Sequence, residues 1–264
     1  DYHLLGGGDS KEVYVGWNHV QQIEIAWNQI VYYEDDEKLF TEEATLLKSL
    51  NHERIIKCCH YWFDSESKIL NTITELFSSG SLKKYIHNGV GVDLVSIKNW
   101  GRQILQGLCF LHSQSPKIIH RDIKCDNVFV ASDGKQFGLA VCIMDGDFVK
   151  EKEPKCTPEF MAPMCLLEMV TGEYPYMKCS NQMHIFKKVY TGVKPVSLGN
   201  VKDYRVRDII EKCILPMSVR PSAEELLKDP FFLYNGRSST FETCAPVDNI
   251  LTSRAMNIKH LYLV

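Results

Sequence analysis

One stretch of the sequence decides how the rest is interpreted: His120-Arg121-Asp122-Ile123-Lys124-Cys125-Asp126-Asn127. It places an aspartate, a lysine two positions later and an asparagine five positions later on one short segment. Phosphoryl transfer uses these three groups as a base for the attacking hydroxyl, a cation for the transferred phosphate and an oxygen ligand for a metal ion. An ordinary charged loop does not explain why the three occur at this spacing. The stretch therefore indicates a phosphoryl-transfer loop.

Length and charge limit the class of protein. The 264 residues include 30 Lys and Arg against 33 Asp and Glu, a net charge of −3. A chain of this length forms one large domain or two modest lobes, and it needs neither disulfides nor a metal ion to fold. The charge argues against a nucleic-acid binder that works through bulk positive charge. The apolar runs are shorter than the roughly 18 residues of a membrane span. We therefore expect neither nucleic acid nor a membrane among its partners.

The ten cysteines include no Cys-x-x-Cys pair and no metal-ligand spacing. Together with the absence of a leader segment, this pattern is typical of reduced thiols in a cytoplasmic protein. The sequence begins at Asp1 rather than at Met, which we interpret as a fragment or an extracted domain.

The order of the predicted elements is strands first and helices afterwards. Residues 2–33 alternate in period two, residues 38–50 change to helical spacing, and residues 69–77 form an apolar run before the polar connector Ser78-Ser79-Gly80-Ser81. A long core helix is predicted from the stripe Ile97, Ile104, Leu108 and Leu111. Two amphipathic helices are predicted over 181–192 and 206–214, and Ser222 with Glu225 predicts a capping box. This order favours an α+β protein with two lobes.

Two features of the strand-rich part have two interpretations each. Gly6-Gly7-Gly8, followed by Lys11 and Val13, is compatible with a phosphate-binding loop or with a flexible hairpin turn. If Val13 contacts the base of a bound nucleotide, the period-two alternation puts Lys11 on the same face of the strand, where it would contact the phosphates. Glu43 falls on the apolar face of its helix, where a buried carboxylate needs a cationic partner. A partly exposed glutamate at the edge of that face is the other interpretation.

The chain resembles the eukaryotic protein kinases, and in particular the plant members of the with-no-lysine (WNK) family, from about Tyr2 to Phe232. Ordinary kinases have Val-Ala-Ile-Lys on the third strand, whereas this sequence reads Ile25-Ala26-Trp27-Asn28. Lys11 stands where the third glycine of the glycine-rich loop would be, and this exchange of lysine position defines the family. The segments TPEFMAP (157–163), GEYPY (172–176) and RPSAEELLKDPFF (220–232) resemble it nearly word for word.

The resemblance implies a bilobal kinase fold. The kinase domain would cover residues 1–232, with a strand-rich small lobe over about 1–76 and a helical large lobe over about 77–232. Residues 233–264 form an unassigned tail. The implied activity is ATP-dependent phosphorylation of Ser and Thr hydroxyls of proteins in intracellular signalling.

The resemblance also implies the site residues. Val13 and Ala26 would sandwich the adenine of ATP, Thr74 would lie at the back of the pocket, and Glu75 to Phe77 would be the hinge. Asp122 would be the base, Lys124 would contact the transferred phosphate, and Asn127 would bind Mg²⁺. Glu43 would pair with Lys11. The residues implied in nucleotide binding are Gly6, Gly8, Lys11, Val13, Ala26, Thr74, Glu75, Phe77 and Asn127.

The sequence departs from the family pattern in two places. Gln136 replaces the aspartate of Asp-Phe-Gly, so we expect weakened magnesium binding. About seventeen residues of the pattern are missing after Pro163, which shortens the central helix of the large lobe. The alternatives to an active kinase are therefore a catalytically impaired pseudokinase that serves as a scaffold, and the product of a truncated gene model.

Overall fold

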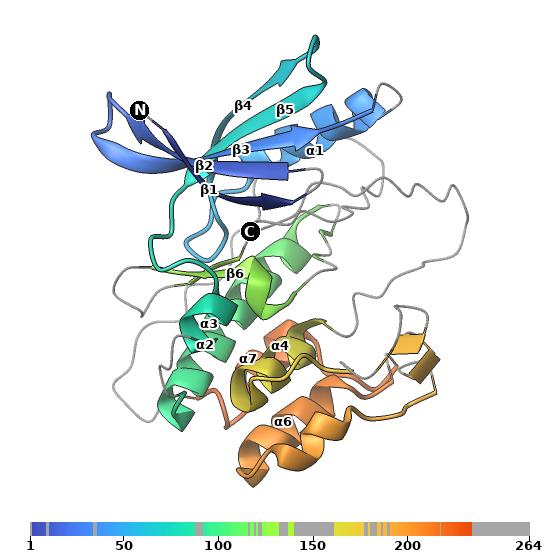
Figure 1. The fold of residues 1–264 in the computed structure, drawn as a ribbon. Coiled ribbons are helices and arrows are strands. Elements are labelled where there is room, and N and C mark those ends of the chain that lie inside the picture. Colours follow the sequence, from blue (N-terminus) through green and yellow to red (C-terminus); the bar gives the residue numbers. More distant parts are fainter. Residues whose placement is uncertain are drawn as a thin grey trace.

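The protein is described from a computed structural model. The residues that the structure describes are 2–8, 11–33, 36–87, 92–115, 117–118, 120, 123–131, 137–139, 161–176, 179, 184–185, 187–188, 191–216 and 218–233. A β-sheet with one helix occupies the upper part of Figure 1, and the other labelled helices form the lower part. The strand β6 (Val128–Val130) lies between the two parts (Figure 1). The predicted α+β kinase-like fold is confirmed.

The upper part contains a five-stranded antiparallel sheet with the strand order β1-β2-β3-β5-β4. Its strands are β1 (His3–Gly8), β2 (Lys11–Asn18), β3 (Ile23–Val31), β4 (Cys58–Asp64) and β5 (Ile69–Glu75). The turns before β3 and β5 contain Gln22 and Lys68, both with positive φ. The period-two pattern of the sequence thus predicts the sheet correctly, and the 69–77 run is a strand as expected.

The two faces of the sheet differ in exposure. The outer face has a row of aromatic rings from Tyr14, Trp27 and Trp62, in which the Trp27 and Trp62 rings stack with centroids 6.2 Å apart. The indole Nε1 of Trp27 donates a hydrogen bond of 2.9 Å to the Asn71 side chain. The inner face is buried, and α1 (Glu37–Ser49) packs beside the sheet (Figure 1). The buried side chains of α1 are Phe40, Glu43, Ala44 and Leu47.

The lower part is helical. Its helices are α2 (Leu82–His87), α3 (Leu94–Ser113), α4 (Met161–Thr171), α6 (Tyr204–Cys213) and α7 (Ala223–Leu227). Two 3-10 turns, η2 (Cys125–Asn127) and η4 (Val196–Asn200), and the short strand β7 (Phe137–Leu139) complete it. The expected long core helix is α3, and Asp93 caps its start by accepting a hydrogen bond from the Ser96 N–H. The capping box of Ser222 and Glu225 is also present.

The sequence prediction for residues 181–192 is only partly testable. His184, Ile185, Lys187 and Lys188 are helical, and Gly192 ends the segment with a φ of 72°. The Thr191 N–H donates to the Lys187 carbonyl, and residues 181–183, 186, 189 and 190 lie outside the described residues. Helix α4 runs across the point where the family pattern is interrupted, between Pro163 and Met164. The proline falls in the first turn of the helix, where it is tolerated because its missing N–H has no helical partner.

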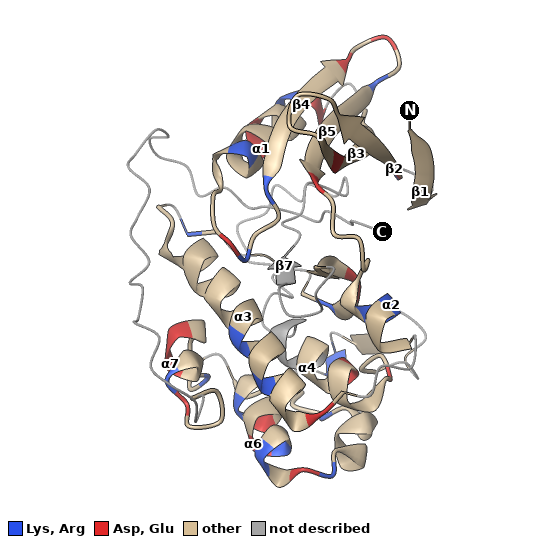
Figure 2. Ribbon diagram, turned by 90° about the vertical axis from the view of Figure 1, so that its left-hand side faces the viewer, with Lys and Arg blue, Asp and Glu red and all other residues tan. Residues whose placement is uncertain are grey.

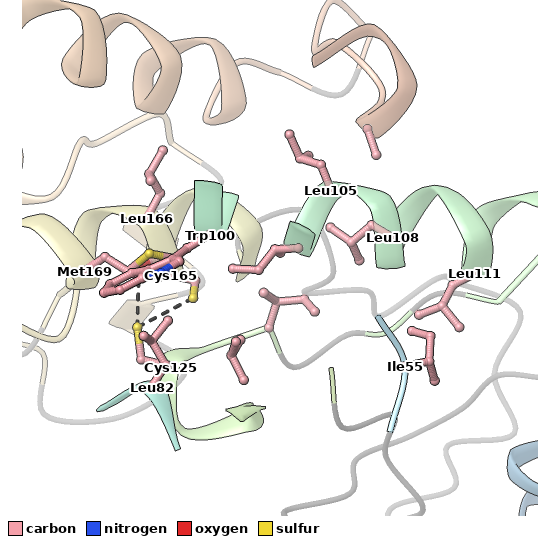
Figure 3. Packing of buried hydrophobic residues seen from close by; sticks show 14 of the residues in the cluster. Ile55, Leu82, Trp100, Leu105, Leu108, Leu111, Cys125, Cys165, Leu166 and Met169 are labelled. Carbon is pink, nitrogen blue, oxygen red and sulfur yellow. Dashed lines mark hydrogen bonds between the residues drawn. The ribbon is translucent and has the colours of Figure 1, made fainter. Parts of the chain in front are cut away.

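One hydrophobic core runs through both parts of the molecule. It contains residues of α1 and of the segment between α1 and β4, together with residues of α3, α4, α6 and α7. The His52 ring stacks on the Phe110 ring of α3 with centroids 4.6 Å apart, so the two parts meet at the end of α3. Figure 3 shows Ile55 beside Leu111 in the same region. The sheet is therefore seated on α3 through the segment that precedes β4.

The helices differ in the sign of the charges that they carry. In Figure 2, α6 has both blue and red residues, whereas the charged residues of α7 are the acidic Glu224 and Glu225. Among the described residues, no helix combines the length and the apolar character that crossing a membrane requires.

We predict that Gly101→Ala destabilises the protein. A Cβ at Gly101 would lie 2.8 Å from Cε1 of Phe232, a ring that is itself buried. Overpacking of this kind costs about 1–3 kcal/mol, whereas alanine gains only about 0.5–1 kcal/mol over glycine within a helix. The net loss should appear in the free energy of unfolding from urea denaturation. Gly199→Ala is the matched control, because no atom lies within 4 Å of its Cβ. Equal stability of the two variants would contradict the packing described here.

Candidate active site

The inner face of the sheet brings the predicted nucleotide-binding residues together. Val13 pairs with Asn28, Val15 with Ala26, and Ala26 with Thr74. Directly opposed residues of antiparallel strands point to the same face. The face therefore consists of Val13 and Val15 from β2, Ala26 and Asn28 from β3, and Thr72 and Thr74 from β5, all of them buried.

One expectation from the sequence needs correction at this point. Val13 and Ala26 were expected to enclose a base from two sides, but both lie on the same face of the same sheet. They can contact only one side of a flat ring. The other side has to be covered from the lower part of the molecule.

Asn28 occupies the position of the absent strand lysine. It is completely buried, and its Nδ2 donates hydrogen bonds of 3.4 Å to the Thr72 carbonyl and to Thr74 Oγ1. These two bonds hold the amide against β5. A neutral amide cannot replace a lysine as a charge partner for phosphate, so the cation has to come from another strand.

Lys11 is that candidate cation. It lies two residues before Val13 on an uninterrupted strand, so it projects to the same inner face, as the sequence predicted. Its side chain is half-buried. Glu43 of α1 is 5% exposed, which excludes the interpretation that it is a partly exposed residue at the edge of the helix face. The pairing of Lys11 with Glu43 stays a prediction.

Hydrogen bonds fix the connector after β5, which is the predicted hinge. The Glu75 N–H donates to the Lys57 carbonyl, and the Glu75 carboxylate accepts from the Lys57 N–H at 2.8 Å. The Phe77 carbonyl accepts from the Gly80 N–H. These bonds fix the course of the connector. The Glu75 carbonyl and the Phe77 N–H are the groups that we assign to a bound base.

Strand β6 fastens this connector to the catalytic segment. The Val130 N–H donates to the Gly80 carbonyl at 3.0 Å, and Ser79 Oγ donates to the Ala131 carbonyl at 3.1 Å. Val128 and Val130 point into the core, and Phe129 points the other way, with its ring 6.5 Å from the Phe77 ring. Phe129 is therefore a candidate to cover the other side of a bound base. Sequence reasoning missed it, although the alternation in Val128-Phe129-Val130 was a usable signal.

The described end of the catalytic stretch, residues 123–127, forms a largely buried turn that leads into β6. His120, Ile123, Cys125 and Asn127 are almost or completely buried, and Lys124 is half-buried. The Asn127 N–H donates to the Lys124 carbonyl at 2.9 Å, which closes the turn. The main chains of Lys124 and Asn127 are thus bonded to each other, and the roles of the two side chains stay predictions. Asp122 and Gln136 lie outside the described residues, and so does the tail 234–264.

Asp126 is paired with a lysine. Its carboxylate accepts two hydrogen bonds from Lys83 of α2, at 3.1 and 3.2 Å. Burial disfavours the charged form of Lys83, but the neighbouring Asp126 carboxylate outweighs burial and raises the pKa of the lysine. Among the described residues, no cluster of three or more His, Cys, Asp or Glu side chains is arranged to hold a metal ion.

A comparison with known families fits this geometry. The sequence model described as "Protein kinase domain" matches residues 1–232. The chain belongs to the protein kinase family. The match ends at Phe232, after α7, and residues 233–264 lie outside the matched range.

Two curated relatives of this kinase chain come from Arabidopsis thaliana. Serine/threonine-protein kinase WNK8 is 47% identical over 262 residues, covering 88% of this chain and 46% of the relative. Probable serine/threonine-protein kinase WNK10 is 44% identical over 271 residues, covering 92% of this chain and 51% of the relative. The chain thus spans about half the length of these relatives. The resemblance to plant WNK kinases that the sequence suggested is confirmed.

We predict that Lys11→Met weakens nucleotide binding at least about tenfold. A hydrogen bond to a charged group contributes about 1.5–3 kcal/mol, and about 1.4 kcal/mol corresponds to a factor of ten. Asn28→Met should have a smaller effect, because Asn28 carries no charge and its amide is bonded to β5. Calorimetric titration with ATP measures both variants. Comparable losses would contradict the assignment of Lys11 as the phosphate anchor.

Proposed function

We propose that this kinase chain transfers the γ-phosphoryl group of ATP to Ser and Thr hydroxyls of protein substrates, as a with-no-lysine kinase. The observation that carries the proposal is the linkage of two sites. The catalytic turn runs into β6, and β6 is hydrogen-bonded to the connector that follows the nucleotide-facing strand β5. This linkage supports the proposal, because the bonds between β6 and the connector would position a bound nucleotide relative to the catalytic residues. We assign the small lobe to about 1–76 and the large lobe to about 77–232.

The roles follow from the chemistry of the groups. The inner face of β2 and β3 covers one side of adenine, and Phe129 covers the other. Lys11 binds phosphate oxygens, with Glu43 holding its ammonium group in place. Gly6 and Gly8, which lie in the last part of β1, let the backbone come close to the phosphates. Lys124 neutralises the group in transfer.

Asp122 accepts the proton of the substrate hydroxyl while the oxygen of that hydroxyl forms the new bond to phosphorus. The bond between that phosphorus and the β–γ bridging oxygen breaks, and ADP leaves with the bonding electrons. Lys124 and Thr157-Pro158-Glu159 match Ser/Thr kinases rather than tyrosine kinases. We place this activity in cytoplasmic signalling, with ATP and Ser/Thr-containing proteins as its partners.

Mg²⁺ fits this site only in part. Asn127 is fully buried at the end of the turn beside Lys124, and its amide oxygen is a suitable ligand. The position of the second protein ligand is taken by Gln136, which lacks the charge of a carboxylate. When bound, the ion offsets phosphate charge. In this chain Lys11 and Lys124 supply most of the positive charge from the protein.

Turnover tests the proposed function. We expect the chain to phosphorylate a generic Ser/Thr protein substrate slowly, and Asp122→Asn to reduce this rate by about 10²-fold or more. Radiolabelled phosphate transfer from Mg-ATP measures it. Gln136→Asp should raise the rate. If Asp122→Asn leaves the rate unaltered both in the chain as it stands and in the chain that carries Gln136→Asp, the chain is a pseudokinase.

Magnesium dependence gives an independent measurement. A ligand that binds the folded state raises its stability by RT ln(1 + [L]/Kd), so the ATP-induced shift in Tm reports affinity without turnover. We expect Mg²⁺ to change this shift little in the chain as it stands and to increase it clearly in Gln136→Asp. A strong magnesium effect in the unaltered chain would show that another carboxylate, such as Asp133, serves as the second ligand.

A further inference from the structure

The catalytic turn is attached to α4 at Cys125, the residue that follows Lys124. The Cys125 N–H donates a hydrogen bond of 3.2 Å to Glu168 Oε2, and both residues are buried. The Cys125 thiol lies 3.6 Å from the Cys165 thiol and 3.6 Å from the Cys165 carbonyl (Figure 3). Cys165 and Glu168 are three residues apart, so they share one face of α4. That face is therefore the surface on which the turn rests.

Glu168 is an unusual residue for such a position. Its side chain is only 4% exposed, and burial raises the pKa of its carboxyl group. The charged or polar groups that face it are the Cys125 N–H and thiol, the Asp126 carboxylate and the Lys83 ammonium. Lys83 is already bonded to Asp126. A carboxylate in this environment costs stability, so its placement calls for a contact that an apolar side chain cannot make. The bond to the Cys125 N–H is that contact.

We propose that Glu168 is a positioning residue of the active site, which fixes the backbone between Lys124 and Asn127 by accepting the Cys125 N–H. The effect on phosphate transfer rests on the proposed kinase function. The hydrogen bond between Glu168 and the Cys125 N–H does not depend on that function. The turn is closed by the bond between the Asn127 N–H and the Lys124 carbonyl. Holding Cys125 therefore sets the positions of both flanking side chains together. The Lys83–Asp126 pair braces the same turn from α2.

This arrangement assigns a task to the part of α4 that follows the interruption at Pro163. The sequence suggested that the missing segment shortens the central helix of the large lobe. The residues from Cys165 to Met169 are nevertheless buried, and two of them, Cys165 and Glu168, contact the catalytic turn directly. Glu168 thus secures the turn without any residue of the missing segment.

Matched variants separate positioning from simple core filling. Glu168→Gln retains an acceptor oxygen at the same place, and Glu168→Leu retains similar bulk without an acceptor. Glu168→Asp keeps the charge but withdraws the carboxylate by one methylene. Met169→Leu is the control for a general loosening of α4, because Met169 is its buried neighbour and a volume-conserving change there is tolerated.

Hydrogen exchange of the full chain, followed by mass spectrometry of peptides covering 123–130, measures how firmly the turn is held. We expect exchange at least about tenfold faster in Glu168→Leu and Glu168→Asp, and near-unaltered exchange in Glu168→Gln and Met169→Leu, because one lost hydrogen bond to a charged group corresponds to about a tenfold change or more. The rates of phosphate transfer should follow the same order, with kcat falling and the KM for protein substrate unchanged. Rescue by glutamine is the result that a merely space-filling role would not produce.

The proposal is overturned if the leucine and aspartate variants exchange as slowly as the unaltered chain, or if the glutamine variant exchanges as fast as they do. If Glu168→Leu does not fold, the comparison of Glu168→Asp with Glu168→Gln decides the matter in the same way. Failure of the proposed function is recognised separately, because a chain that binds no ATP and transfers no phosphate still gives the exchange result. The two ideas can thus fail independently.

Discussion

The burial of α3 is the constraint from which the other elements take their positions. Ile104, Leu108 and Leu111 face the core, while Gly101 allows the Phe232 ring to approach the helix backbone. The Trp100 ring packs against the Tyr85 ring of α2, and the Phe110 ring stacks on the His52 ring of the segment before β4. A helix surrounded in this way cannot rotate without displacing its neighbours. The contacts with α3 therefore fix the positions of the sheet, α2 and α7 relative to one another.

The fold followed from the sequence because its elements have strong local signals. Alternation in β2 and β3, the 3.6-residue stripe of α3 and the capping box at Ser222 are each determined by residues close together in the chain. Helical spacing also placed Glu43 on the apolar face of its helix, where it is buried together with Phe40 and Leu47.

The candidate site was predictable in its residue types and less so in its geometry. Period two placed Lys11 and Val13 on one face, and the family resemblance supplied the roles of Lys124 and Asn127. That Val13 and Ala26 lie on the same face could be established only from the register of the strands, which depends on pairing between separate segments. Phe129 and Glu168 were missed for the same reason. Their significance comes from partners 52 and 43 residues away, at Phe77 and Cys125.

The aromatic row on the outside of the sheet has a spectroscopic consequence. Trp27 separates Ala26 from Asn28 in the chain, so its indole lies on the reverse side of the strand that forms the nucleotide face. It is anchored to Asn71 and stacked on Trp62, which is 39% exposed. Indole emission depends on the polarity and rigidity of its surroundings. A change in the twist of β3 that accompanies ligand binding would therefore alter the native tryptophan fluorescence. The emission of Trp27, on the outer face, would then report binding at the inner face of the same strand.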